Sequence, residues 1–260
     1  MKYTKLILAS AALFLAIASC KSEYEALLNS NDVDAKFAAA FDYFNQKKYA
    51  KAAQLFESMS VLTSGTERDD TVQYYWGLSN YRFKDFYTAE TNFSKFIEQF
   101  PRSPFADDAR FLRLDCLYRS TYRYELDQMP TYACLQAIAE YLASGVTDES
   151  KIDICNKMSA DLNERLDRKA YENARLSYES KQKERYLTFV DDYLNFIGEI
   201  PESKYRRELD VMYKRAQRAL GRYTGTEEEL DAKEKDFARE RKELEKQESK
   251  KNETSSGKAR

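Results

Sequence analysis

Histidine is absent from this chain of 260 residues. Imidazole is the commonest general base and the commonest metal ligand in proteins, so its absence argues against an enzyme or a metal centre. The sequence also has no glycine-rich phosphate loop, no zinc-ligand spacing and no nucleophile elbow. Its many carboxylates are scattered among lysines and arginines, as they are on solvated helix faces. We therefore expect no catalytic residue, no metal and no cofactor.

Proline and glycine are scarce, with 4 and 7 residues. Both disfavour helix interiors, and the sequence also lacks the period-two runs of Val, Ile and Thr that would indicate strands. These absences predict an all-α chain. The formal net charge is -2, which gives no electrostatic support for binding to nucleic acid.

One long apolar run is present, from Leu6 to Ile17. It follows two lysines and is too short for a comfortable transmembrane helix, as in a signal peptide. The ending Ile17-Ala18-Ser19-Cys20 resembles the lipobox of bacterial lipoproteins, which implies cleavage before Cys20 and acylation of that cysteine. Three acyl chains suffice for stable anchoring. The alternative is an ordinary signal peptide with an unrelated cysteine. By enterobacterial sorting rules, the lack of an aspartate directly after Cys20 favours the outer membrane.

A proline corner occurs twice, one hundred residues apart. Residues 96–109 read F-I-E-Q-F-P-R-S-P-F-A-D-D-A, and residues 196–209 read F-I-G-E-I-P-E-S-K-Y-R-R-E-L. Proline ends the first helix of each stretch because it lacks an amide hydrogen. Ser103 and Ser203 can then accept hydrogen bonds from the first free amides of the next helix. Self-similarity at long range indicates a repeat architecture.

The apolar spacing predicts a tetratricopeptide-repeat α-solenoid of about five helix pairs. This repeat has an aromatic at the turn into its second helix, then a small residue, then another aromatic. Tyr49, Ala52 and Phe56 match in the first pair, over residues 34–59. The second pair matches through Trp76, Gly77, Tyr81, Phe86, Ala89, Phe93, Phe96 and Pro101. Its glycine and alanine are expected to allow close helix approach.

The later pairs are less regular. The third contains an atypical link over residues 120–131, after which Cys134 takes the small-residue position. The fourth runs from about Ile152 to Ile200, and Phe189 replaces its small residue, so looser or shifted packing is expected there. A fifth pair follows, whose second helix is either absent or supplied by the tail.

The tail is almost purely charged from Glu227, with charge spacings that favour a solvated helix. Leu230, Phe237 and Leu244 offer an apolar seam at period seven, and residues 250–260 are predicted to be disordered. The predicted organisation is a signal peptide at 1–19, a lipidated N-terminus and polar leash at 20–33, a solenoid at 34–225 and a charged tail at 226–260.

Three cysteines remain after Cys20. An oxidising periplasm would permit a disulfide between Cys116 and Cys134, which lie on either side of the link. The favoured alternative is that both are small buried apolar residues.

Several stretches resemble the BamD family, the lipoproteins of the outer-membrane β-barrel assembly machine. They are residues Tyr124–Gln128 within the link, the run Lys169–Arg175 and the corner Pro201–Arg206. All three are similar to Bacteroidota members of the family. The resemblance covers roughly residues 34–220. It is specific in the link and the run, and generic in the corner, which many such repeats share.

The resemblance implies a non-enzymatic, periplasm-facing scaffold that is lipid-anchored in the outer membrane. Its C-terminal half is expected to bind the POTRA region of a BamA-type barrel protein, and its N-terminal repeats to receive unfolded outer-membrane protein precursors. The inner wall of a solenoid comes from the first helix of each pair. The predicted client-binding residues on that wall are Tyr74, Tyr81, Arg82, Phe37, Phe41 and Phe44.

The six client-binding candidates divide into two kinds. Tyrosine and arginine have polar tips that favour a wet surface. The phenylalanines fit an ordinary interhelical core at least equally well.

Two other classes of function remain open. Another tetratricopeptide-repeat adaptor lipoprotein of the cell envelope, with no link to barrel insertion, would carry the same repeats. A peptidoglycan-active enzyme would need two carboxylates at glycosidase distances in a cleft, and the sequence offers no candidate pair. Co-purification with a BamA-type barrel protein would separate barrel assembly from the adaptor.

Overall fold

The computed structural model describes residues 23–222 and, in the tail, residues 228, 230–232, 235–240, 242, 243 and 246. Every regular element in these residues is helical, which confirms the predicted all-α solenoid class. The predicted signal peptide, Cys20, Leu244 and residues 250–260 lie outside the described residues.

The chain forms two compact units. The first unit comprises residues up to Tyr122 together with Asp127–Ser159, and the second comprises Arg123–Leu126 and the chain from Ala160 onward. The division therefore falls in the link and inside the long helix α8, Glu149–Glu179. Each unit has its own core and is described by itself.

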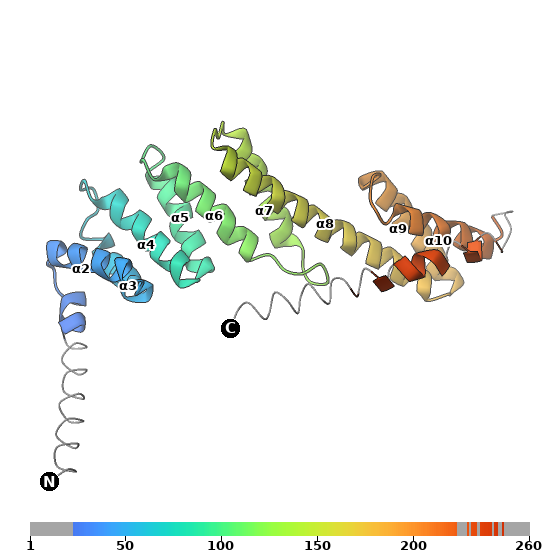
Figure 1. The fold of residues 1–260 in the computed structure, drawn as a ribbon, viewed down its shortest axis with the longest axis horizontal. Helices are drawn as coiled ribbons and strands as arrows, with labels where there is room; N and C mark the ends of the chain where they lie inside the picture. Colours follow the sequence, from blue (N-terminus) through green and yellow to red (C-terminus); the bar gives the residue numbers. More distant parts are fainter. Residues whose placement is uncertain are drawn as a thin grey trace, which may run out of the picture. The chain divides into compact units, whose positions relative to one another are not determined.

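Between the helical residues 23–28 and the start of α8, the first unit consists of three antiparallel helix pairs, and consecutive helices pack side by side (Figure 1). These helices are α2 (Val33–Asn45), α3 (Tyr49–Ser60), α4 (Asp69–Phe83), α5 (Phe86–Gln99), α6 (Ala106–Arg119) and α7 (Met129–Ala143). The pairing is the one that the repeat pattern predicts.

The predicted small positions allow close helix approach. A Cβ atom on Gly77 would lie 2.9 Å from Cε1 of Phe93, closer than real Cβ atoms come to a neighbour. Ala52, Ala89 and Cys134 are fully buried at the small-residue position of the second helix in their own pairs. The structure thus confirms the packing role expected for Cys134.

The segment predicted as a polar leash is partly ordered, which corrects that prediction. Residues 23–28 are helical, and Tyr24 packs into the core of the first pair. The Tyr24 hydroxyl donates to the carbonyl oxygen of Lys51 at 3.0 Å, and burial raises the pKa of Tyr24 to about 12. Lys36 is buried and donates from Nζ to the Leu28 carbonyl at 2.9 Å, which ties this short helix to α2. Tyr24 is a single aromatic residue outside the periodic apolar pattern of the repeats, so the sequence did not indicate that it is buried.

The second unit contains the later part of α8, then α9 (Lys183–Glu199) and α10 (Arg206–Ala219). Their common core is aromatic. Phe189 is fully buried and packs against Tyr178 and Tyr193, with ring centroids 5.3 and 6.3 Å away. Of the two alternatives expected at Phe189, looser packing is wrong, because neighbouring tyrosines pack against the larger ring.

Tail residues contact α10. Leu230 is buried, Asp231 forms an ion pair with Arg215, and the guanidinium of Arg207 lies 5.9 Å from the ring centroid of Phe237. These contacts support the alternative in which the tail supplies the missing partner of the fifth pair.

Lysine occupies the left-handed position in three interhelical turns. The φ angles are 60° at Lys47, 70° at Lys84 and 54° at Lys181. Such angles are uncommon for residues other than glycine. The turns between α2 and α3, α4 and α5, and α8 and α9 therefore share one local geometry, although none has glycine at this position.

The proline corner between α5 and α6, which we call the first corner, joins two helix pairs. Ser103 Oγ accepts a hydrogen bond from the amide of Phe105 at 3.3 Å and donates to Asp70 at 2.8 Å. The Phe105 ring stacks on Tyr74 at 4.5 Å, and the Tyr74 hydroxyl donates to Asp108. Asp70 and Tyr74 lie one turn apart on α4, so Ser103 and Phe105 of the corner contact the same face of that helix.

The corner between α9 and α10, the second corner, repeats this arrangement. Ser203 Oγ accepts from the amide of Tyr205 at 3.1 Å and donates to Asp167 at 2.7 Å. Tyr205 stacks on Tyr171 at 4.4 Å, and the Tyr171 hydroxyl donates to Glu208 at 2.9 Å. Both serines therefore accept an amide hydrogen bond, but the donor is the residue directly before α6 or α10, whereas the sequence predicted an amide inside the helix. Their second role, as donors to an aspartate of the preceding pair, was not predicted.

Candidate functional site

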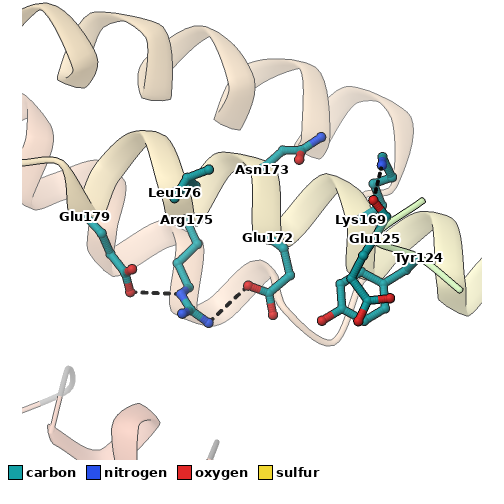
Figure 2. A pocket seen from close by; sticks show the side chains of 8 residues that line it. All are labelled: Tyr124, Glu125, Lys169, Glu172, Asn173, Arg175, Leu176 and Glu179. Atoms are coloured by element: carbon teal, nitrogen blue, oxygen red, sulfur yellow. Dashed lines mark hydrogen bonds and ion pairs between the residues drawn. The ribbon is translucent and has the colours of Figure 1, made fainter. Parts of the chain in front are cut away.

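A hollow in the second unit brings the link and the α8 run together (Figure 2). Both stretches carried the specific part of the family resemblance, although 44 positions separate Glu125 from Lys169. We call this surface the link hollow. Its lining residues are Tyr124, Glu125, Lys169, Glu172, Asn173, Arg175, Leu176 and Glu179.

Two cations of α8 hold the link in place. Lys169 Nζ donates to the carbonyl oxygen of Leu126 at 3.0 Å. The guanidinium of Arg168 lies 4.4 Å from the ring centroid of Tyr124, a cation–π contact. Partial burial raises the pKa of Tyr124, although the charge of Arg168 opposes that shift. Residues 124–128 of the link belong to no helix, so these side chains fix their position on α8.

The other wall of the link hollow is a row of charges on α8. Arg175 lies between two glutamates, 3.1 Å from Glu172 and 2.9 Å from Glu179 (Figure 2). Residues three and four apart on a helix are neighbours, which explains the pairing. Leu176 is 72% exposed beside this row. The hollow thus presents an aromatic ring and an aliphatic side chain among both signs of charge.

This chemistry suits a polypeptide surface. An apolar centre with a polar rim is the usual anatomy of a protein interface. Three glutamates line the hollow, and each has a cationic partner: Glu172 and Glu179 pair with Arg175, and Glu125 lies 3.9 Å from Arg123. Among the described residues, no group of three or more Cys, Asp and Glu could hold a metal ion. No helix in that part of the chain is long and apolar enough to cross a membrane.

The structure corrects the prediction that Tyr74 faces a wet groove. Tyr74 is only 5% exposed, and its hydroxyl donates to Asp108 of the next pair. Burial and this hydrogen bond hold its pKa well above the usual range. Its polar tip is satisfied by a carboxylate instead of water, so Tyr74 is a contact between helix pairs.

Tyr81 and Arg82 are more accessible than Tyr74. Tyr81 is half-buried, and its hydroxyl donates to Asp115 at 2.6 Å. Burial and that hydrogen bond raise the pKa of Tyr81 to about 12. Arg82 is exposed at the end of α4. Client binding by these two residues stays a prediction.

The three predicted phenylalanines lie in the aromatic core between α2, α3 and α4. Phe37, Phe41 and Phe44 are half-buried. Phe41 packs 4.8 Å from Phe37 and 4.6 Å from Tyr75, and Phe44 lies 5.4 Å from Tyr75. They contribute to the interhelical core, and their exposed edges leave client binding as a prediction.

The three cysteines that the structure describes are buried. Cys116 and Cys134 form no disulfide in the structure, and neither does Cys155. Burial raises the pKa of Cys116 to about 12, which disfavours its reactive thiolate. The structure agrees with the alternative of small buried apolar residues and corrects the disulfide hypothesis.

Sequence reasoning missed a series of tyrosine–carboxylate hydrogen bonds between pairs. Tyr74 and Asp108 are 34 positions apart, and so are Tyr81 and Asp115. This offset equals the length of one tetratricopeptide repeat. A search for tyrosine and acidic residues at that separation would have found both pairs.

A direct comparison with curated protein sequences finds no match. The sequence profile of the family YfiO, described as outer membrane lipoprotein, matches residues 30–231. That range contains all the helix pairs, both corners and the link hollow. The chain therefore belongs to the YfiO family of outer membrane lipoproteins.

Proposed function

We propose that this protein is a non-enzymatic scaffold of the β-barrel assembly machine. In this proposal, acyl chains on Cys20 hold it in the outer membrane, facing the periplasm. Its second unit binds the POTRA region of a BamA-type barrel protein. The family assignment supports an outer membrane lipoprotein of this kind.

The observation that carries the proposal is the link hollow. The link and the α8 run are the two stretches that resemble the barrel-assembly lipoproteins specifically, and they line one surface. Leu176 is exposed there among charged groups, where a partner could bury it. Buried anchors surrounded by polar residues supply most of the binding energy at protein interfaces.

The experiment is co-purification of the barrel protein with a C-terminally tagged full chain. We expect the wild-type chain to retain a BamA-type barrel protein and Leu176→Asp to lose it. Loss of a buried anchor costs about 2 kcal/mol or more, equivalent to roughly a thirtyfold weaker complex. The matched control is Leu194→Asp on α9, because Leu194 is 48% exposed and does not line the hollow.

Each outcome of this experiment has a distinct meaning. If the wild-type chain retains no barrel protein, the cell-envelope adaptor becomes the better hypothesis. If both variants lose the barrel protein, the link hollow is not the specific contact. Circular dichroism of both variants would show whether lost binding comes from lost helix.

We further propose that the first unit receives unfolded barrel precursors. The residues proposed for this role are Tyr81, Arg82, Phe37, Phe41 and Phe44. Their exposed edges combine aromatic surface with one cation. A photo-reactive peptide with the alternating aromatics of a barrel strand is the probe. Tyr81→Ala with Arg82→Glu should reduce cross-linking to this unit, and unchanged cross-linking would rule these two residues out.

A further inference from the structure

We propose that a basic surface on the first unit binds the phosphate headgroups of the bilayer that holds the acyl chains. We call this surface the turn patch. It comprises exposed residues of the α2–α3 turn and of the α4–α5 turn, namely Lys47, Lys48, Lys51, Arg82, Phe83 and Lys84. The proposal rests on the lipid anchor at Cys20 that the proposed function includes.

The turn patch carries uncompensated positive charge. Its six residues, with Tyr49 and Ala50, line one hollow that contains no acidic side chain. None of its five cations forms an ion pair with any residue that the structure describes. The neighbouring acids Asp42 and Asp85 form no ion pair with these cations; Asp42 accepts a hydrogen bond from Gln46, and Asp85 accepts one from the amide of Thr88. Phosphodiesters would supply the missing negative charge.

An exposed aromatic residue lies among these cations. Phe83 is 57% exposed and lines the same hollow. Apolar rings beside lysines and arginines are typical of surfaces that lie in the interfacial region of a bilayer. The combination favours a membrane surface over a purely aqueous anion, which would gain nothing from the ring.

The anchor brings this surface close to the bilayer. The Tyr24 hydroxyl donates to the Lys51 carbonyl, and Lys51 Nζ lies 4.8 Å from the Tyr24 ring centroid. Four residues of chain, from Cys20 to Tyr24, span at most about 14 Å even when fully extended. An acylated Cys20 therefore keeps the turn patch within reach of headgroups. Basic residues near an anionic leaflet are attracted to it over about a Debye length.

The α8–α9 turn supplies a matched control. It also has a lysine at positive φ, Lys181, and an exposed lysine two residues later, Lys183. The variant Lys181→Glu/Lys183→Glu thus repeats the charge change of Lys48→Glu/Lys84→Glu in the same kind of turn. Arg82 stays unchanged in both, so that client binding is not disturbed.

The test measures amide hydrogen exchange on the full lipid-bearing chain, reconstituted on vesicles. Vesicles of phosphatidylethanolamine with phosphatidylglycerol are compared with vesicles of phosphatidylcholine. We expect slower exchange at residues 46–51 and 82–86 on the anionic vesicles. Each charge removed should weaken the contact about fivefold, so the Lys48→Glu/Lys84→Glu variant should exchange at the rate seen on neutral vesicles. The Lys181→Glu/Lys183→Glu variant should behave as the wild-type chain.

The intact mass of the purified chain tests the proposed lipid anchor at Cys20 separately from headgroup binding by the turn patch, before exchange is measured. If Cys20 carries no lipid, the proposed anchor fails and this inference fails with it. If the lipid is present but exchange is equal on both vesicle types, the turn patch does not bind headgroups while the anchor stands. Slowing that occurs only after a BamA-type barrel protein is added would assign the patch to a protein partner and overturn the inference.

Discussion

The two proline corners share one framework and differ in what surrounds it. In each corner, a serine donates a hydrogen bond to an aspartate of the preceding pair, and an aromatic ring stacks on a tyrosine. The hydroxyl of that tyrosine donates a hydrogen bond to a carboxylate. At the first corner the stacking ring is Phe105, and Lys151 of α8 lies 3.5 Å from Asp108. At the second corner it is Tyr205, whose hydroxyl donates to Glu164 at 3.2 Å.

Comparing the corners separates the contacts that both contain from the charges that differ between them. The serine, the stacked rings and the tyrosine–carboxylate bond occur in both, so they set the angle between successive pairs. The outer charges differ in exposure: the side chain of Lys151 at the first corner is 17% exposed, whereas that of Glu164 at the second is 44% exposed, where an ion pair contributes little to stability. The corners therefore have different surroundings and a common centre.

The largest expected effects come from removing the stacked tyrosines. Tyr74 is 5% exposed and Tyr171 is 2% exposed, and truncation of a buried aromatic ring to alanine costs about 3–5 kcal/mol. Because each ring lies in its own core, Tyr74→Ala should accelerate hydrogen exchange in α4–α6. Tyr171→Ala should accelerate it in the second half of α8, α9 and α10. If either variant accelerated exchange equally in both units, the division into two cores would be wrong.

The next largest effect is expected from removing the tyrosine hydroxyls, which tests whether both contribute equally to the free energy of unfolding. Tyr74→Phe and Tyr171→Phe keep the stacked ring and remove the hydrogen bond to Asp108 or Glu208. Hydrogen bonds to charged groups contribute about 1.5–3 kcal/mol. We expect similar losses in urea unfolding at the two sites, although the pairs differ in acid and in spacing. A loss at only one site would show that the second bond is incidental to its corner.

Much of this framework was predictable. Pro101 and Pro201 end their helices, and Gly77 marks a close helix approach, because these effects are local to the residue. The burial of Tyr74 was not predictable, since periodicity gives the face of a helix, and this ring is buried by Phe96 of its own pair together with Phe105 at the start of the next. Likewise, both stretches of the link hollow were recognised separately. Their meeting depends on Lys169 reaching a backbone carbonyl that sequence patterns do not reveal.

Smaller effects are expected from the corner serines, and they should differ. Ser203 Oγ lies 2.7 and 2.9 Å from the two oxygens of Asp167, which is 8% exposed. Asp70, the partner of Ser103, is only half-buried, so water can replace the lost donor there. A hydrogen bond contributes about 1 kcal/mol, and more when its loss leaves a buried charge unpaired. Thermal unfolding should therefore show a larger loss for Ser203→Ala than for Ser103→Ala, and the reverse order would contradict this account.

The smallest effect is a pH dependence at the second corner. Burial raises the pKa of Asp167 above its ordinary value of 3.8, although the hydrogen bond from Ser203 opposes the shift. A carboxyl with a raised folded-state pKa stabilises the fold while it is protonated, and this contribution is lost as pH rises through the folded pKa. Asp167→Asn keeps an oxygen that can accept from Ser203 and cannot ionise. The melting temperature of this variant relative to wild type should therefore increase from about pH 4 to neutral pH. Asp70→Asn at the first corner is the matched control, and an equal increase there would show that burial of Asp167 is not the cause.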